Sequence, residues 1–99
     1  MGISIRAAEE TETNKNLYYK VTAEGEVIIT GSPSQEEITI PAVIDGMPVA
    51  GIAENAFLNR NDIKKVTIQS GVRYVGEHAF AECGMLEAVI FENGLQYIG

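Results

Sequence analysis

The sequence has few of the residues on which catalytic and metal sites depend. It contains one cysteine, Cys83, and one histidine, His78. A single cysteine excludes an internal disulfide framework, and one histidine with no cysteine partner fits none of the usual zinc spacings. Nothing resembles a Ser-His-Asp triad, a calcium-binding loop or a nucleotide-binding fingerprint. We therefore expect no enzyme activity, no cofactor and no metal, with Cys83 packed beneath a turn and His78 in solvent.

Long apolar runs are lacking as well, and basic residues are scarce. No stretch approaches the roughly 20 apolar residues that cross a bilayer, so membrane insertion is not expected. The chain has 7 basic and 14 acidic residues and a net charge of −7. This balance argues against binding to a nucleic-acid backbone. Residues 1–16 have no apolar core of the kind that secretion signals contain. We expect them to form a polar leader that is either disordered or weakly helical over residues 7–12.

What the sequence does contain is a repeat. When the chain is shifted by 23 residues, residues 56–57 match 79–80 and residues 66–68 match 89–91. A period in the twenties is typical of a solenoid, in which each coil packs against the next because no coil covers its own apolar side. The sequence therefore predicts an α/β to mainly β repeat fold that presents surface rather than chemistry.

We expect residues 17–99 to form one domain. Its β-prone stretches on either side of Gly25 predict a hairpin over residues 17–30. Three repeats follow, and the last is incomplete. The first repeat is longer than the others by five residues around Asp45-Gly46, a pair that favours an extra turn. The repeats cover residues 37–62, 63–85 and 86–99.

Each repeat is predicted to contain a short strand, a corner, a second short strand and about one helical turn. Alternation within residues 65–68 directs every second side chain inward. The helical turns are expected over residues 53–58 and 76–81. Asn93-Gly94 is also a strong signal for an antiparallel hairpin, but it matches Ser70-Gly71 one repeat earlier. We therefore favour a coil corner that the two repeats share.

The candidate partner-binding residues project outward from the predicted strands in two rows. One row follows the first strand of each repeat, and the other places Tyr74 beside Tyr97 on neighbouring coils. Tyrosine is favoured at recognition surfaces, and the alternative is that this pair only stabilises the sheet. The full set is Thr39, Lys65, Thr67, Arg73, Tyr74, Ile90 and Tyr97.

The repeats of this chain resemble those of a known family, the BspA-like leucine-rich repeat proteins. Residues 40–49 and 52–57 are similar to the first repeat of that family. Residues 75–83 are similar to its pattern Ile-Gly-x-x-Ala-Phe-x-x-Cys. The chain departs from the family at Ala53, where glycine is preferred, and at Arg60, where cysteine is common.

The resemblance implies a right-handed leucine-rich-repeat solenoid of about two and a half 23-residue coils with one-turn helices, preceded by an N-terminal β-hairpin cap. It also implies a non-enzymatic protein-binding or adhesion module of a bacterial protein that is secreted or located at the cell surface. The expected partner is a protein, such as a host or extracellular-matrix protein, or a glycan.

The alternative function is a structural spacer or self-assembly segment of a longer repeat protein. The sequence stops inside the third repeat, so we expect apolar side chains to be exposed at that end of the stack. A homodimer through this uncapped C-terminal coil is the corresponding prediction.

Overall fold

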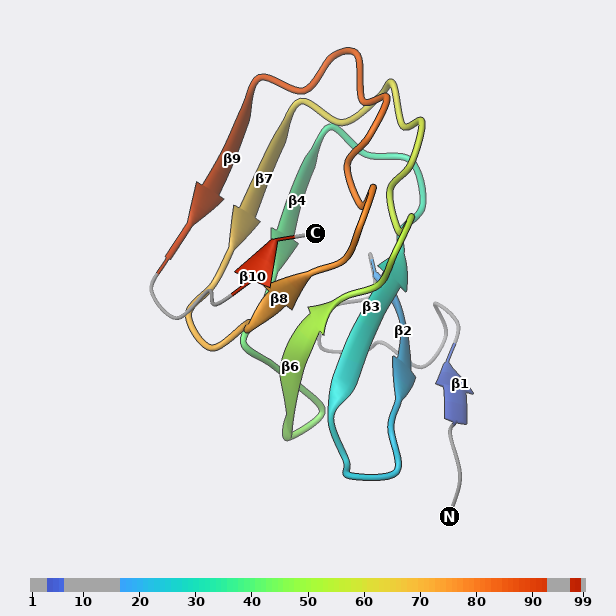
Figure 1. Cartoon of the computed structure of the whole chain (residues 1–99), viewed down its shortest axis with the longest axis vertical. Coiled ribbons are helices and arrows are strands. Elements are labelled where there is room, and N and C mark those ends of the chain that lie inside the picture. The colour runs from blue at the N-terminus through green and yellow to red at the C-terminus, as the bar shows by residue number, and fades with distance from the viewer. Residues whose placement is uncertain (1–3, 7–16, 93–96, 99) are drawn as a thin grey trace.

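The computed structural model describes residues 4–6, 17–92 and 97–98, and the side chains of residues 17–92. Every regular element in this part of the chain is a β-strand (Figure 1). In chain order the strands are β1 (Ser4–Arg6), β2 (Tyr18–Val21), β3 (Val27–Gly31), β4 (Glu37–Ile40), β5 (Val43–Ile44), β6 (Met47–Ile52), β7 (Lys65–Ile68), β8 (Tyr74–Val75), β9 (Ala88–Phe91) and β10 (Tyr97–Ile98).

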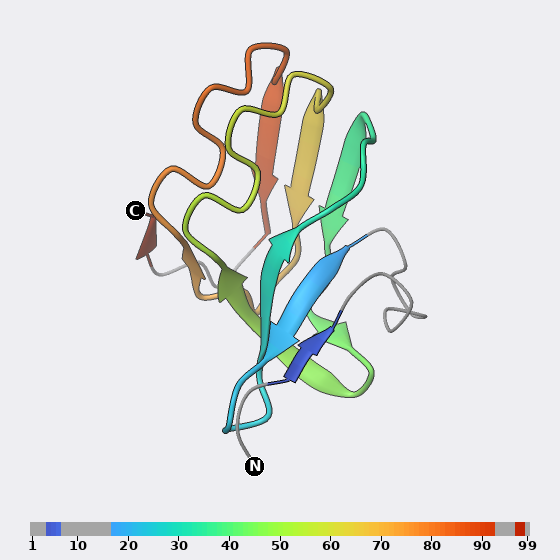
Figure 2. The same cartoon turned by 90° about the vertical axis from the view of Figure 1, so that its right-hand side faces the viewer.

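The first strands of the repeats form a parallel sheet in the order β4-β7-β9. Val66 lies between Ile38 and Val89 in its register, and Ile68 lies between Ile40 and Phe91. Figure 2 shows the three strands side by side, with the looping connections of successive coils stacked next to them. The predicted parallel stacking, at 28 and then 23 residues, is therefore confirmed.

A second sheet runs in the order β1-β2-β3-β6-β8-β10, and β5 pairs with β6. The pairs of β3 with β6, β6 with β8 and β8 with β10 are parallel, whereas β1, β2 and β3 pair antiparallel. Because β9 and β10 belong to different sheets, residues 88–91 and 97–98 are not hairpin partners. The antiparallel hairpin is therefore not formed, whereas the shared corner predicted at Asn93-Gly94 lies outside the described residues.

The two sheets enclose one core. Ile52 and Phe57 are completely buried, and Val66 and Val75 are 0% and 3% exposed. The ring of Phe80 lies parallel to that of Phe57, with an interplanar angle of 1° and 5.3 Å between centroids. This stack confirms that equivalent side chains of neighbouring coils lie one above the other in a common interior.

The predicted helical turns are wrong. Residues 53–59 and 76–82 form successive turns, and no residue described by the structure is in a helix. The reason is a left-handed backbone at equivalent positions of both coils, with φ of 61° at Asn55 and at His78, and of 65° at Asn59 and 60° at Glu82. Such residues interrupt the right-handed conformation that a helix needs.

The turns instead bond to the next coil. The amide of Asn55 donates to the carbonyl of Glu77 at 3.0 Å, and the amide of Phe57 donates to that of Ala79 at 2.8 Å. These bonds satisfy backbone groups that a helix would have satisfied internally. The turn side of the molecule is therefore a hydrogen-bonded ladder between coils, like the strand sides.

The five additional residues of the first repeat form a small hairpin of β5 and β6. Asp45 and Gly46 have φ of 52° and 78°, as a type I′ turn requires, and Val43 pairs with Pro48. The hydroxyl of Tyr19 donates to Asp45 at 3.0 Å and ties this hairpin to β2. The extra length therefore leaves the stack as a side hairpin.

The N-terminal part contains two further antiparallel pairs. Strands β2 and β3 are joined by a turn at Gly25, whose φ of 82° suits glycine, as expected from the sequence. Strand β1 pairs with β2 within the segment predicted to be a disordered leader, so that prediction does not hold for Ser4–Arg6. The rest of residues 1–16 lies outside the described residues.

Candidate binding surfaces

The outward side of β4, β7 and β9 forms the first candidate surface, which we call the strand face. One of its rows runs from Thr39 through Thr67 to Ile90, and these residues are in register on adjacent strands. They alternate with the buried residues of the core, so their side chains point away from it. Glu37, Lys65 and Ala88 form the neighbouring row.

The strand face combines an apolar side chain with polar neighbours. Ile90 is 43% exposed, next to the half-buried Thr67 and the exposed Lys65. Two other basic side chains nearby in the sequence are paired, since Arg60 contacts Asp62 and Lys64 lies 3.8 Å from Glu36. Lys65 has no ion pair within the described part of the chain. It therefore offers a charge that a partner can use.

The second candidate surface lies on the other sheet and is built around Tyr74. The register aligns Lys20, Ile28, Gly51 and Tyr74 across β2, β3, β6 and β8. Their neighbours Ile29 and Ile52 are in the core, whereas Ile28 is not part of the core cluster. The row is therefore on the outer side of the sheet. Tyr97 pairs with Tyr74 in the backbone as predicted, but its side chain lies outside the described residues.

The Tyr74 ring lies flat on Gly51. A Cβ atom built on this glycine would lie 2.4, 2.4 and 2.6 Å from three consecutive ring carbons, Cε1, Cζ and Cδ1. Nearly equal distances to three adjacent carbons place the point above the face of the ring, since an edge contact would be much closer to the middle atom. Only glycine leaves room for this stacking. Burial raises the pKa of Tyr74.

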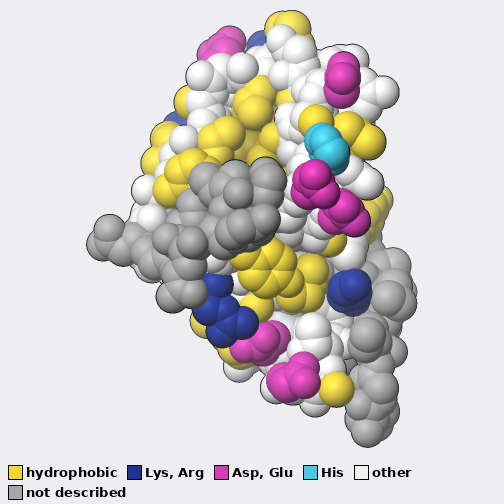
Figure 3. Space-filling model, viewed as in Figure 1, with side chains coloured by type: hydrophobic (Ala, Val, Ile, Leu, Met, Phe, Trp, Pro, Cys, Tyr) yellow, Lys and Arg dark blue, Asp and Glu magenta, His cyan; other side chains and the backbone are white. Residues whose placement is uncertain are grey.

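A charged pair borders this ring. Arg73, which precedes Tyr74 on the chain, donates a hydrogen bond from Nη2 to Oε1 of Glu26 at 3.2 Å. The two side chains are 48% and 30% exposed. Figure 3 shows the apolar patch over β3 and β6, with basic and acidic side chains beside it. We call Tyr74, Gly51, Ile28 and this charged pair the tyrosine platform.

The predicted binding residues therefore divide between two surfaces. Thr39, Lys65, Thr67 and Ile90 lie together on the strand face, and Arg73 and Tyr74 lie on the tyrosine platform. Both sheets contribute their inner side chains to one core, so the two candidate surfaces lie on opposite sides of that core. The structure does not bring the two groups into one site.

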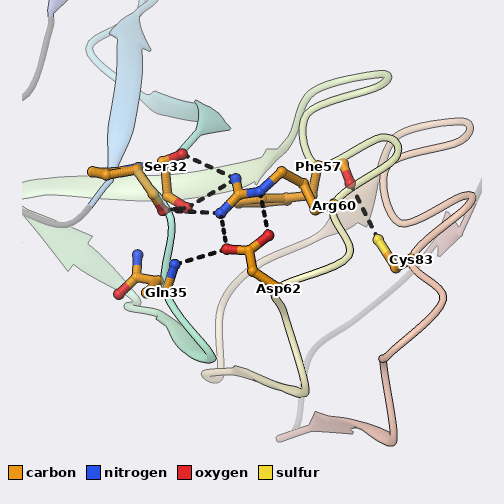
Figure 4. Close-up of polar contacts among 7 residues, drawn as sticks. Ser32, Gln35, Phe57, Arg60, Asp62 and Cys83 are labelled. Carbon is orange, nitrogen blue, oxygen red and sulfur yellow. Dashed lines mark hydrogen bonds and ion pairs between the residues drawn. The ribbon is translucent and has the colours of Figure 1, made fainter.

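A third cluster, centred on Arg60, was missed at the level of sequence (Figure 4). Arg60 donates to both carboxylate oxygens of Asp62, at 2.9 and 2.8 Å, and to the carbonyls of Ser32 and Pro33, each at 2.9 Å. Asp62 also accepts from the amide of Gln35 at 2.8 Å. The sequence feature that could have indicated this cluster is Arg60 itself, which stands at the position where the repeat pattern has cysteine.

Cys83 shows what that position does in the following coil. Its thiol donates to the carbonyl of Phe57 at 3.2 Å, one coil back, and the side chain is half-buried. The guanidinium of Arg60 lies 5.9 Å from the ring centroid of Phe57, which belongs to the same coil as Arg60. The longer side chain bridges to the connection between β3 and β4, where no equivalent coil is stacked. The Arg60 hydrogen bond holds the pKa of Asp62 well below its usual range.

A family model described as a BspA type leucine-rich repeat region (6 copies) matches residues 26–99. The chain belongs to this family. Leucine-rich repeats of this type generally serve as scaffolds for protein interactions and are typically non-catalytic. The described residues of this BspA type chain contain no cluster of three His, Cys, Asp or Glu side chains suited to a metal ion, and no helix long and apolar enough to span a membrane.

Solved structures of bacterial leucine-rich repeat proteins are similar to this BspA type chain. One from T. pallidum is 32% identical, with a TM-score of 0.79, and the match covers 85% of this chain and 40% of that chain. One from Bacteroides capillosus is 29% identical, with a TM-score of 0.74 and coverage of 84% and 66%.

A leucine-rich cell surface protein from Faecalibacterium prausnitzii is 27% identical, with a TM-score of 0.67 and coverage of 79% and 22%. The BspA type chain thus spans less than two thirds of the length of each of these three proteins. No curated protein matches it.

Proposed function

We propose that the chain is a non-enzymatic protein-binding and adhesion module of a bacterial protein that is secreted or located at the cell surface. The observation that carries this proposal is the strand face, where Ile90 is 43% exposed in register with Thr67 and diagonal to Lys65, which has no ion pair among the described residues. Protein interfaces favour an apolar anchor with a polar rim. A rigid parallel sheet also presents these side chains with little loss of conformational entropy on binding.

The class of partner follows from the family and from this surface. BspA type repeats generally bind proteins, and one similar structure belongs to a cell surface protein. A surface-attached module with such a strand face would meet host and extracellular-matrix proteins first. A glycan partner would require a different kind of surface, which the tyrosine platform offers.

The architecture that supports this function is a right-handed leucine-rich-repeat solenoid over residues 17–99, capped by the β2–β3 hairpin. In support of the cap, β3 pairs in parallel with β6 of the first coil, and its residues Val27 and Ile29 are completely buried. The hairpin thus covers apolar surface that a first coil would otherwise expose.

A second candidate function is a spacer or self-assembly segment, which would include a homodimer through the last coil. It is favoured by the exposure of Phe91, 41%, on β9, whose equivalent Ile68 in the preceding coil is 2% exposed. In the described sheet, β9 is an edge strand. An edge strand with exposed apolar side chains favours pairing with another chain.

Binding of the purified chain to immobilised extracellular-matrix proteins tests the two functions. The variant Ile90→Asp with Thr67→Arg should abolish binding if the strand face is used, while Glu54→Arg, on the exposed turn side, should leave binding unchanged. Equal binding by both variants, or no binding by the unmodified chain, would reject the adhesion function.

Light scattering at high concentration measures the homodimer, and a dimer lost on Phe91→Asp would support self-assembly.

A further inference from the structure

The tyrosine platform has the geometry of a site that stacks a flat, apolar ligand surface. One face of the Tyr74 ring covers Gly51, so the opposite face is directed away from the sheet. Ile28, next in the row, is buried at 7% exposure, so it supports the sheet beside the ring and presents little contact surface itself. Tyr74 remains partly exposed. The ring is therefore held in a fixed orientation before any ligand arrives.

The edge of this floor carries hydrogen-bonding groups of both kinds. The Arg73 guanidinium donates and the Glu26 carboxylate accepts, and their 3.2 Å contact holds them side by side. The hydroxyl of Tyr74 has no hydrogen-bond partner among the described residues. A ligand that lies on the ring would therefore find a donor, an acceptor and a hydroxyl without a partner among the described residues within the same platform.

These features discriminate between classes of ligand. An aromatic ring attracts cations over its face, but the neighbouring Arg73 opposes a second positive charge there. An anion would meet Glu26 and a chain of net charge −7. A neutral pyranose fits both parts, because its axial C–H groups carry partial positive charge toward the ring face. Its adjacent hydroxyls pair with a carboxylate and a guanidinium as charge-assisted hydrogen bonds.

We propose that the tyrosine platform is a glycan-binding site that stacks one pyranose ring on Tyr74 and holds two of its hydroxyls with Arg73 and Glu26. This site does not depend on the strand face, which lies on the other sheet. Loss of protein adhesion through variants of Ile90 and Thr67 would therefore leave sugar binding intact. The two proposals can fail separately.

Saturation-transfer NMR with methyl β-D-galactopyranoside and methyl β-D-glucopyranoside at millimolar concentrations tests the site. Sorbitol, which has the hydroxyls but no ring, is the control ligand. The unmodified chain should transfer saturation to the C–H protons of a glycoside and not to those of sorbitol. Tyr74→Leu should reduce the transfer about tenfold. Tyr74→Phe should retain most of it, because the ring remains.

Two further variants separate binding from a merely structural role of the ring. Tyr18→Leu removes an exposed tyrosine from β2 and should leave the transfer unchanged. Arg73→Gln leaves the ring on Gly51 and should weaken the transfer several-fold, whether or not Tyr74→Leu folds. Equal transfer to sorbitol, no transfer to either glycoside, or full transfer in Tyr74→Leu and Arg73→Gln would overturn the proposal. The ring would then serve only to cover Gly51.

Discussion

Arg60 makes with a guanidinium the kind of backbone contact that a cysteine thiol makes at the equivalent position of the next coil. In the following coil the small thiol of Cys83 reaches the carbonyl of Phe57 directly. In the first coil the carbonyls to be satisfied belong to Ser32 and Pro33, in a connection that is not itself a coil, and the longer guanidinium reaches them. Unpaired buried carbonyls are costly, so this substitution is a structural adaptation to the start of the stack.

The Arg60–Asp62 pair should make stability depend on pH. In the folded chain the pKa of Asp62 is held below the 3.8 of an unperturbed carboxyl. The ionised pair therefore stabilises the folded chain fully above pH 3.8, and this contribution is lost as the pH falls from 3.8 through the lowered pKa. The free energy of unfolding of the unmodified chain should exceed that of Asp62→Asn by a margin that shrinks between pH 6 and pH 3. Denaturant titrations at each pH measure this margin.

The matching control removes the other partner. With Arg60→Met as the starting point, the margin given by Asp62→Asn should be smaller and should shrink less on acidification. The hydrogen bond that lowers the pKa of Asp62 most is then absent, and only the bond from the Gln35 amide remains. A margin that stays constant with pH in the unmodified chain would show that Asp62 contributes through geometry rather than charge.

Glu82 occupies a backbone conformation that suits asparagine better. Its φ is 60°, and Asn55 and Asn59 adopt similar values in the coil before it. Left-handed conformations cost a glutamate more than an asparagine. Glu82→Asn should therefore raise the free energy of unfolding by about 0.5 kcal/mol or more in chemical denaturation. Glu77→Asn removes the same charge at a residue whose φ is not positive, and should give no such gain.

At the scale of elements, the stack of turns depends on ring-to-ring packing between coils. Phe57 and Phe80 are parallel at 5.3 Å, and Phe57 is completely buried. A double-mutant cycle with Phe57→Leu and Phe80→Leu should give a coupling energy of about 0.5–1.5 kcal/mol, since each leucine removes the same aromatic pair. Strict additivity of the two single losses in thermal unfolding would show that the rings fill space without interacting.

The elements also show where sequence reasoning succeeds. Alternation in residues 65–68 predicted β7 with the observed bounds, and the match of 66–68 with 89–91 predicted its partner β9, because the inward side chains repeat at the spacing that a stack requires. The turns were misassigned because Asn55 and His78 carry no marker of left-handed backbone as plain as glycine. Their conformation is set by hydrogen bonds to the next coil, which is a tertiary effect.

The candidate sites were predictable only in part for a similar reason. Outward positions such as Thr67 and Tyr74 follow from alternation. The contact of the Tyr74 ring with Gly51 requires knowing that β6 and β8 are neighbours in this register. The Arg60 cluster likewise joins residues 28 positions apart, beyond the reach of any local pattern.

At the scale of the whole molecule, burial is uneven along the stack. Val66 and Ile68 on β7 are 0% and 2% exposed, whereas Phe91 on β9 is 41% exposed. Strands with less buried apolar surface open locally at lower free energy. Stability in this chain should therefore decrease from the middle coil toward β9.

Hydrogen exchange followed by NMR checks this gradient. Backbone amides of β7 should exchange at least about tenfold more slowly than those of β9 under native conditions. The amides of Asn55 and Phe57, which bond to the neighbouring coil, should be protected although they lie outside any strand. Uniform protection of β7 and β9 would mean that the stack opens only as a single unit.

The small hairpin of β5 and β6 has a consequence for how such proteins diversify. It adds five residues to one coil while the pairings of β4 with β7 and of β6 with β8 remain in step. The entropic cost of closing a loop at a solvent-facing tip grows only slowly with the length of the loop. The Asp45-Gly46 tip is thus a natural grafting point for a foreign peptide, provided that the insertion keeps Asp45 as the acceptor of the Tyr19 hydroxyl.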